Sequence, residues 1–547
     1  MAGKEKQASF ITQGIILAVA SVIVRLIGLI YRIPLANTIG DDGLGAYSNA
    51  FEVYNIALLL STYSIPTAIS KLISEREDKK EYGNSYHMFQ VGMIFAAILG
   101  FLASLLLFLG ADFIAEYVFK EADLSTAIPL KVLAPTIFVF SIMGVIRGYF
   151  QGKHTVIPTS VSQILEQIVN AVVSVVAAKL LISHFSASDK ISAYGAAGGT
   201  LGTLCGALTA LVFLLFVFFC YYPYLKKRVR KDKIGAYEDR ALLLKLLLLT
   251  TAPIILNQTV YSVSSLLDSV LLNQILDGKG VADTVRREWF GLYSGKYRLM
   301  TNVPIAIASS IGMATLPSIV QAHTKRNQEL LHGRIAQAIK LNMLIAFPCA
   351  GGMAVLAAPI MRFVFGESGE ALTITSRMMY IGAASIIFFA YSTATNSILQ
   401  GVNRMRVPVI HGVISLAIYL VLDIVLLMFT PLGVYTLVIG NMVFPLIISV
   451  LNWLRLKKET GYVQELDRTF LRIGLCTVFM AVLSLLIYRG MMFLTESNAI
   501  SLCAAIGLAM IIYFVMLILF RAVEEEELMD MPKGALLVRI AKKLNLM

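Results

Sequence analysis

The stretch FITQGIILAVASVIVRLIGLIYRIPLA, residues 10–36, is an apolar run long enough to cross a membrane as a helix, and it contains two arginines. Arg25 and Arg32 are seven residues apart, almost two helical turns, so both guanidinium groups project from one face. An arginine that faces lipid at this depth costs several kcal/mol. That face must therefore meet protein or a watery cavity, and a cationic wall inside a membrane indicates a path for an anionic ligand.

The rest of the chain has the same apolar character. Of its 547 residues, 57% are hydrophobic and only 15% are charged, which is typical of a polytopic membrane protein. Apolar runs predict fourteen transmembrane helices, at residues 9–36, 44–74, 84–110, 127–150, 156–182, 195–222, 240–274, 288–321, 333–358, 372–400, 406–429, 433–454, 470–490 and 498–521. The predicted fold class is all-α.

The positions of the basic residues predict the orientation of these helices. Of the 46 lysines and arginines, 32 lie in the termini and in the loops on the same side as the termini, and eight lie on the opposite side. Loops rich in lysine and arginine stay in the cytoplasm, so we expect both termini there. The net charge of +12 therefore reflects membrane topology and does not indicate a nucleic-acid partner.

Short motifs recur six helices apart. Gly45-Ala-Tyr-Ser returns as Gly291-Leu-Tyr-Ser, and Phe150-Gln-Gly returns as Leu399-Gln-Gly. Because equivalent helices keep the same sidedness, the repeat predicts two parallel, pseudo-symmetric six-helix lobes. The predicted parts are a first lobe at 1–225, a basic cytoplasmic linker at 226–245, a second lobe at 240–455, two extra helices at 470–522 and a cytoplasmic tail with an amphipathic helix at 523–547.

Charged residues inside the predicted spans are the candidate binding residues. No HExxH, P-loop or CxxC motif occurs, so the sequence favours a non-enzyme that uses ions or the membrane potential. At 1.5 Å per residue, the candidate substrate-binding residues lie at similar depths in the membrane. They are Arg25, Arg32, Glu52, Lys296 and Arg298. The alternative is that Arg25 and Glu52 form a buried structural pair and that Lys296 snorkels outward.

Three further acidic residues lie within predicted spans. Glu166 is flanked by glutamines, which fits either a polar contact between helices or a proton-coupling role. Asp268, Asp423 and Asn441 offer hard oxygen ligands of the kind that bind Na⁺. The alternative is that the two aspartates form separate hydrogen bonds near the surface.

Two motifs resemble a known transporter superfamily. Arg25-Leu-Ile-Gly-Leu-Ile-Tyr-Arg-Ile-Pro34 resembles the first helix of the MOP exporter superfamily, most of all its branch of MurJ lipid II flippases and stage V sporulation protein B-like proteins. Gly291-Leu-Tyr-Ser-Gly-Lys-Tyr-Arg-Leu-Met300 is similar to the eighth helix of that branch. Tyr31 occupies the place of the family's second arginine, and Tyr419 replaces an expected asparagine of its sodium site.

The resemblance implies alternating access, an arginine-lined cavity for the substrate diphosphate and a groove for its lipid tail along the last two helices. It also implies a sodium site at Asp268, Asp423 and Asn441. We therefore expect a monomeric flippase of the bacterial plasma membrane that moves an undecaprenyl-diphosphate-linked saccharide, most of all lipid II, without a required cofactor. The alternatives are an exporter of another lipid-linked polysaccharide precursor, a MATE-type multidrug antiporter and a membrane scaffold that transports nothing.

Overall fold

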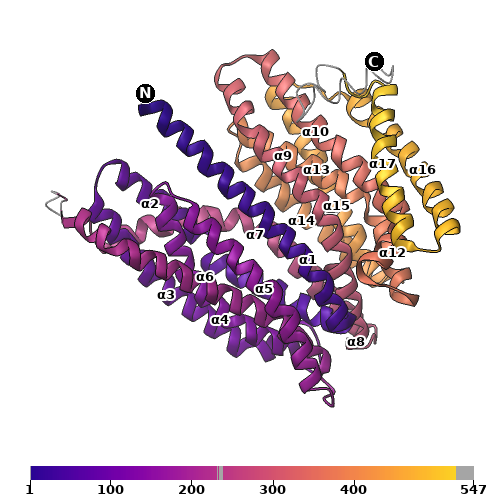
Figure 1. Cartoon of the computed structure of the whole chain (residues 1–547), viewed down its shortest axis with the longest axis horizontal. Helices are drawn as coiled ribbons and strands as arrows, with labels where there is room; N and C mark the ends of the chain where they lie inside the picture. The colour runs from indigo at the N-terminus through magenta and orange to yellow at the C-terminus, as the bar shows by residue number, and fades with distance from the viewer. Residues whose placement is uncertain (1, 231, 233–237, 525–547) are drawn as a thin grey trace. The chain divides into compact units, whose positions relative to one another are not determined.

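The computed structural model describes residues 2–230, 232 and 238–524, and every regular element within these ranges is helical (Figure 1). The predicted all-α membrane fold is thus confirmed. The chain divides into two compact units, Met1–Gly291 and Leu292–Met547, and each is described by itself. The predicted amphipathic helix of the tail lies outside the described residues.

The described residues of the first unit form eight α-helices and two short π-helical segments. They are α1 (Ala2–Leu58), η1 (Leu59–Tyr63), α2 (Ile65–Asp78), α3 (Tyr82–Phe113), η2 (Ile114–Val118), α4 (Ala127–Gly152), α5 (Ile157–His184), α6 (Ile191–Arg230), α7 (Arg240–Gly278) and α8 (Asp283–Phe290). Helix α1 joins two predicted spans across a kink at Gly40, whose φ of 70° is in the left-handed region that glycine tolerates best.

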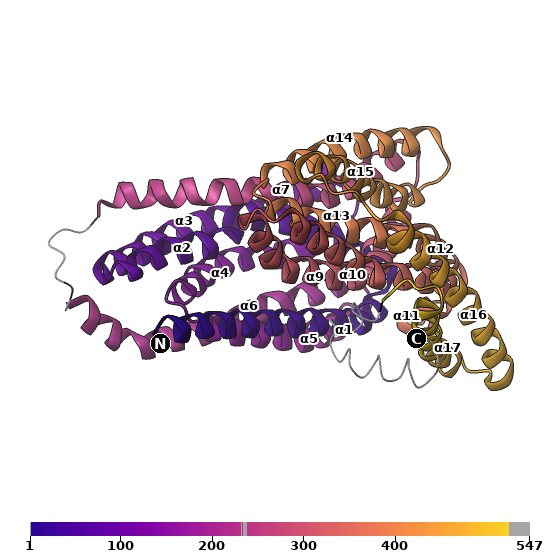
Figure 2. The same cartoon turned by 90° about the horizontal axis from the view of Figure 1, so that it is seen from above.

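Helices α5 and α6 lie side by side because α6 presents a row of glycines (Figure 2). A Cβ atom on Gly202 would lie 2.5 Å from the backbone nitrogen of Ser174, and one on Gly206 would lie 2.5 Å from the carbonyl oxygen of Glu166. Small residues spaced by four allow helix backbones in a membrane to approach closely. The glycine row of α6 therefore fixes the α5–α6 pair.

Helix α7 packs against α1, α2, α3 and α8 of the first unit. The sequence assigns this helix to the second lobe, as the first helix after the basic linker. The two compact units are defined by which helices pack together, whereas the two predicted lobes are defined by the sequence repeat. The limits of the lobes therefore stay a prediction.

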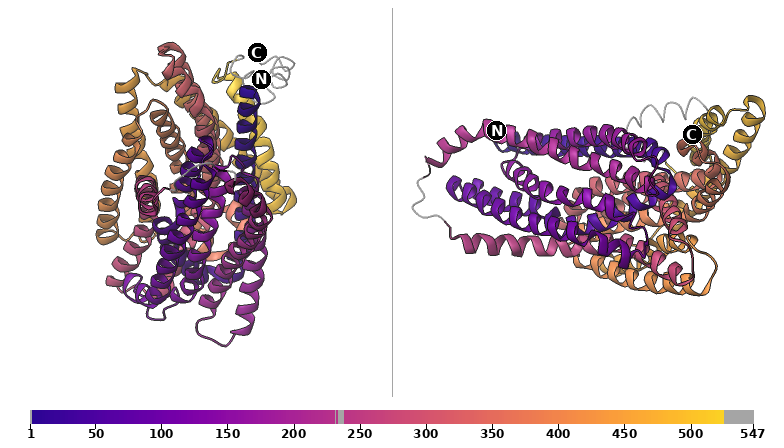
Figure 3. Two further views of the ribbon diagram at one scale, coloured as in Figure 1. Left: turned by 90° about the vertical axis from the view of Figure 1, so that its left-hand side faces the viewer. Right: turned by 90° about the horizontal axis from the view of Figure 1, so that it is seen from below.

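The second unit follows from residue 292 and contains nine α-helices with described residues (Figure 3). Its elements, with the π-helical segments η3 and η4, are η3 (Gly291–Tyr297), α9 (Arg298–Thr324), α10 (Gln328–Val355), α11 (Ala357–Phe365), α12 (Gly369–Gly382), α13 (Ala384–Gly401), α14 (Arg406–Phe429), α15 (Tyr435–Thr460), η4 (Asp467–Leu471), α16 (Arg472–Thr495) and α17 (Asn498–Leu519). Helices α16 and α17 pack as an antiparallel pair, shown in yellow.

The sequence repeat is also a repeat of packing. In the first unit a Cβ atom on Gly152, at the end of α4, would lie 2.8 Å from Cβ of Ile73 in α2. In the second unit a Cβ atom on Gly401, at the end of α13, would lie 2.8 Å from Cγ2 of Ile319 in α9. The glycine of each Gln-Gly motif thus lets its helix touch the helix that ends the second predicted span of its own copy of the repeat.

Among the described residues, ten helices are long and apolar enough to cross a membrane, or eleven if the bent pair α12–α13 is one span. One of these candidates, Ile23–Asp78, covers two of the predicted spans. Each of the fourteen predicted runs consists mainly of helix in the structure, with turns at Ser64, Leu356 and Ala383 inside three of them. The number of helices that cross the membrane nevertheless stays a prediction.

Candidate substrate-binding residues

The two arginines of the first span differ in environment. Arg25 is exposed in the structure, whereas Arg32 is half-buried. Gly28, between them, leaves room for Gln167 of α5, whose Oε1 atom would lie 3.8 Å from a Cβ at this position. The predicted arginine face of α1 therefore carries one solvent-accessible guanidinium and one that is packed among polar groups.

Polar groups gather around Arg32. The charged or hydroxyl-bearing side chains that act on it electrostatically are Tyr31, Tyr47 and Glu52, all from α1. Asn170 of α5 donates a hydrogen bond to the Tyr31 hydroxyl at 3.4 Å. Two predicted site residues, Arg32 and Glu52, are thus brought together within the first unit.

An ion pair of the first unit lies between α4 and α5. Arg147 donates to Oε2 of Glu166 at 2.9 Å and to the Ser162 hydroxyl at 3.0 Å. Arg147 is one of the basic residues predicted to lie on the cytoplasmic side, but only 8% of it is exposed. The structure therefore supports a polar helix contact for Glu166, and a proton-coupling role stays a prediction. In the sequence, Arg147 lies shortly before Gly152 and Pro158, which mark the end of a helix, so it looks like a loop residue. The position of Glu166 in the middle of a predicted span was the only sequence feature that called for a basic partner.

The second unit contains the other two predicted cations. Lys296 lies in η3, is 3% exposed and pairs with Glu367 from the loop between α11 and α12. Glu367 follows Gly366, which has the left-handed conformation that turns the chain after α11. The alternative of an outward-snorkelling lysine does not fit this burial. Sequence reasoning missed Glu367 because it lies in a loop 71 residues away.

Arg298 begins α9 and remains half-buried. Its guanidinium carbon lies 5.8 Å from the centre of the Tyr293 ring, within the range of a cation–π contact. A guanidinium is planar and presents paired donors that match the oxygens of a carboxylate or a phosphate. Its side chain is therefore suited to bind an oxyanion.

The three predicted sodium ligands belong to different units. Asp268 is in α7 of the first unit, whereas Asp423 and Asn441 are in α14 and α15 of the second. Asp423 is fully buried, and a Cβ atom on Gly440 would lie 2.5 Å from its Oδ2 atom. Among the described residues, no three His, Cys, Asp or Glu side chains form a metal-binding group. Asn441 follows Gly440 in α15 and donates a hydrogen bond to the Tyr297 hydroxyl at 3.3 Å. A buried carboxylate is the kind of ligand that a hard cation takes, together with backbone or water oxygens.

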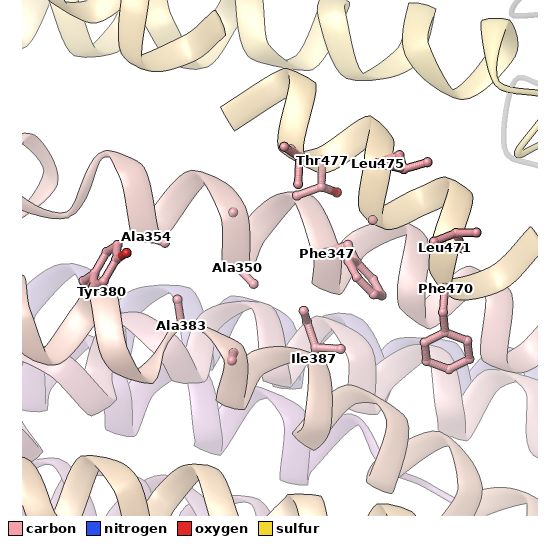
Figure 4. Close-up of a pocket in the computed structure, with 14 residues that line it drawn as sticks. Phe347, Ala350, Ala354, Tyr380, Ala383, Ile387, Phe470, Leu471, Leu475 and Thr477 are labelled. Atoms are coloured by element: carbon pink, nitrogen blue, oxygen red, sulfur yellow. The ribbon is translucent and has the colours of Figure 1, made fainter. Parts of the chain in front are cut away.

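An apolar pocket of about 540 Å³ lies between α10, the α12–α13 pair and α16 (Figure 4). Its walls include Phe347, Ile387, Phe470 and Leu475, and its only hydroxyl groups are those of Tyr380 and Thr477. One wall comes from the first of the two extra helices, which the sequence predicts to border a lipid groove. The composition of the pocket suits a hydrocarbon chain.

Comparisons with known proteins agree with this fold. A family model described as "Polysaccharide biosynthesis protein" matches residues 11–323, and the MatE model matches residues 299–425. Stage V sporulation protein B of Bacillus subtilis (strain 168) is 24% identical over 97% of this chain and 99% of its own length. Lipid II flippase MurJ of the same bacterium is 24% identical over 75% of this chain and 76% of its own.

Solved structures of membrane transporters have a fold similar to that of this chain. A structure of the lipid II flippase MurJ in an inward closed conformation has a TM-score of 0.68 at 15% identity, covering 93% of this chain and 99% of that one. An inward-facing multidrug resistance MATE family transporter has a TM-score of 0.63 at 17% identity, covering 80% and 96%. The chain is a multi-pass membrane protein of the polysaccharide biosynthesis protein family, in the MurJ and stage V sporulation protein B-like branch of the MOP superfamily.

Proposed function

We propose that this protein is an alternating-access flippase that moves an undecaprenyl-diphosphate-linked saccharide, most of all lipid II, to the outer leaflet of the bacterial plasma membrane. The observation that carries the proposal is the exposure of Arg25 on α1, in a stretch that the sequence predicts to span the membrane. Such a group is stable there only where water or an anion meets it. A diphosphate held by charge-assisted hydrogen bonds supplies that anion.

Each remaining candidate has a role in this proposal. Arg298 adds a second planar donor for the diphosphate, and its cation–π contact with Tyr293 supports this role. Arg32, which interacts electrostatically with Glu52, contributes a positive potential beside Arg25. Lys296 forms an ion pair with Glu367, which neutralises its charge. Its main role is therefore to position the start of α9. The apolar pocket beside α16 receives part of the lipid tail.

Reorientation needs a driving force, and we assign it to the membrane potential, with Na⁺ as a further contributor. Asp423 and Asn441 would hold the ion in the second unit, and Asp268 is the candidate ligand in the first. A bound cation there would neutralise a carboxylate that is otherwise buried. We further propose that the protein acts as a monomer, with both termini in the cytoplasm.

A multidrug antiporter is less well supported. Cationic drugs require carboxylates that are not already neutralised. In the first unit, Glu166 pairs with Arg147, and Glu52 lies beside Arg32. The local charge in these helices is balanced or positive, which favours an anionic substrate.

The test is genetic rescue. We expect this gene to restore growth to cells depleted of their only lipid II flippase, and we expect the Arg25→Ala variant to fail at the same expression level. Rescue of a mutant that lacks export of another lipid-linked polysaccharide, without rescue of the lipid II mutant, would assign the protein to that substrate instead. Rescue of neither, by a protein that reaches the membrane, would contradict the proposal.

A further inference from the structure

Helix α8 carries two adjacent arginines whose side chains are almost completely buried, although the sequence places them in a loop between spans. Arg287 is 1% exposed and Arg286 is 2% exposed. A guanidinium keeps its proton at any ordinary pH, so burial must be compensated by neighbouring carboxylates or carbonyls.

Arg287 joins three separate segments of the first unit. Its Nε atom donates to Asp42 at 2.7 Å, and its terminal nitrogens donate to both oxygens of Asp123 at 2.9 Å. Asp283, one turn earlier in α8, lies 3.7 Å away. Two-pronged bonds of this kind are the strongest arginine–carboxylate contacts. We call Arg287, Asp42, Asp123, Asp283 and Glu121 the Arg287 cluster.

Glu121 is the most buried carboxyl group of the cluster, at 1% exposure. It accepts hydrogen bonds from the backbone nitrogen of Thr126 at 2.8 Å and from the Thr126 hydroxyl at 2.6 Å. Among the charged neighbours of Arg287, it has the largest electrostatic effect. Four carboxyl groups thus surround one guanidinium.

The neighbouring arginine does not compensate this surplus of negative charge. Arg286 donates to Asp277 at 2.9 Å and to the carbonyl oxygen of Lys120 at 2.6 Å, so its charge is matched by a carboxylate outside the cluster. A buried excess of carboxylates is relieved when one of them takes up a proton. Glu121 is the group that is best shielded from water.

Helix α8 is seated tightly on the turn that follows the kink of α1. A Cβ atom on Gly45 would lie 2.5 Å from the carbonyl carbon of Arg287, and one on Gly291 would lie 2.7 Å from the backbone nitrogen of Gly45. These two glycines are equivalent in the sequence repeat. The acidic pair at 41–42 lies shortly before the first glycine and the basic pair at 286–287 shortly before the second, so segments of opposite charge precede the two copies of the motif.

Helix α8 leads without a break into η3 and α9, which belong to the second unit. Any movement of α9 in a transport cycle therefore acts on α8. We propose that the Arg287 cluster is a proton-binding latch: Glu121 holds a proton while α8 is seated, and it releases that proton to water when α8 leaves the turn at 40–45. The proposal holds whichever lipid is carried.

The ionisation of the cluster agrees with this assignment. Burial raises the pKa of Glu121 to about 7, against the opposing effect of Arg287 and Thr126. Although burial acts in the opposite direction, bonds from Ser125 and Arg287 lower the pKa of Asp123. The charged and titratable groups around Glu121 and its guanidinium partner include Asp42, Asp123, Asp283, Asp277, Arg286 and Arg287.

The sign of the pH effect follows from linkage. A water-exposed glutamate has a pKa of about 4.3, so the seated state binds the proton more tightly than the released state. Lowering the pH from 8 to 6 must then stabilise the seated α8. With the pKa of about 7 for the seated state, the stabilisation amounts to a change of about tenfold in the seating equilibrium.

Amide hydrogen exchange of the full-length protein in detergent tests the latch. After correction for intrinsic exchange rates, we expect residues 40–46 and 283–290 to exchange about tenfold more slowly at pH 6 than at pH 8. The Glu121→Gln variant mimics the protonated group, so its protection should be the same at both pH values. Arg287→Gln should lose protection of these segments at both.

Lys131→Gln is the matched control, because it removes an exposed ion pair with Asp112 from the same unit. This variant should keep the pH dependence of the parent protein. Equal protection of the parent at pH 6 and pH 8, or a pH dependence that survives in Glu121→Gln, would overturn the proposal. If Arg287→Gln does not fold, the comparison of the parent with Glu121→Gln decides the question.

Discussion

At the scale of single residues, the fate of each intramembrane cation depends on whether a carboxylate lies within reach. Arg147 and Lys296 have such partners and are buried. Arg25 is exposed on α1. A buried ion pair stabilises a protein little in net terms, but removing one partner leaves an uncompensated charge. Paired cations therefore hold helices together, whereas an exposed cation remains available for a ligand.

The Lys296–Glu367 pair gives a test at this scale. We expect Glu367→Gln to destabilise the protein by about 3–5 kcal/mol, because it leaves a buried ammonium group without its carboxylate. Adding Lys296→Met should recover most of that loss. Thermal unfolding in detergent measures both effects, with Asp112→Asn as the control for an exposed pair. Equal melting temperatures for Glu367→Gln and Asp112→Asn would contradict this reading of Lys296.

At the scale of helices, close approach depends on glycines that have no room for a side chain. A Cβ atom on Gly202 meets the backbone of α5 at two points, 2.5 Å from the nitrogen of Ser174 and 2.7 Å from the carbonyl oxygen of Asn170. A backbone contact cannot be relieved by a change of side-chain rotamer, so one of the two helices must shift. Gly352 of α10 has no such neighbour within 4 Å.

These two glycines predict opposite responses to the same substitution. Gly202→Ala should destabilise the protein by about 1–3 kcal/mol through overpacking. Gly352→Ala should be neutral or stabilising by up to about 1 kcal/mol, because alanine favours a helix more than glycine does. Melting temperatures of the two variants in the same detergent measure the difference. A Gly202→Ala variant as stable as Gly352→Ala would show that α5 and α6 are not held by this contact.

The helices were predictable from the sequence because a span needs only a long apolar run, and each of the fourteen runs consists mainly of helix. The repeat was also predictable, since Gly152 and Gly401 keep the same packing role in the two units. Ion partners were not predictable in the same way. Arg287 and Asp42 are 245 residues apart, and only the fold brings them together.

At the scale of the whole molecule, family membership and the position of the charges lead to the same class of substrate. The polysaccharide biosynthesis family model covers residues 11–323, and the relatives named above include a lipid II flippase. The first unit offers an exposed arginine on α1, and the second offers an apolar pocket and an arginine on α9 with a cation–π contact. A polar, anionic headgroup on a long hydrocarbon tail matches these features.

The most direct measurement is the accessibility of lipid II in the outer leaflet of cells that depend on this protein. We expect Arg25→Ala and Arg298→Ala each to lower the flipping rate by about tenfold to a hundredfold, the loss that corresponds to one charge-assisted hydrogen bond to the diphosphate. Lys131→Gln, which breaks an exposed ion pair, should flip at the parent rate. Unchanged flipping in both arginine variants, at equal expression, would contradict the assignment of these guanidinium groups to the substrate.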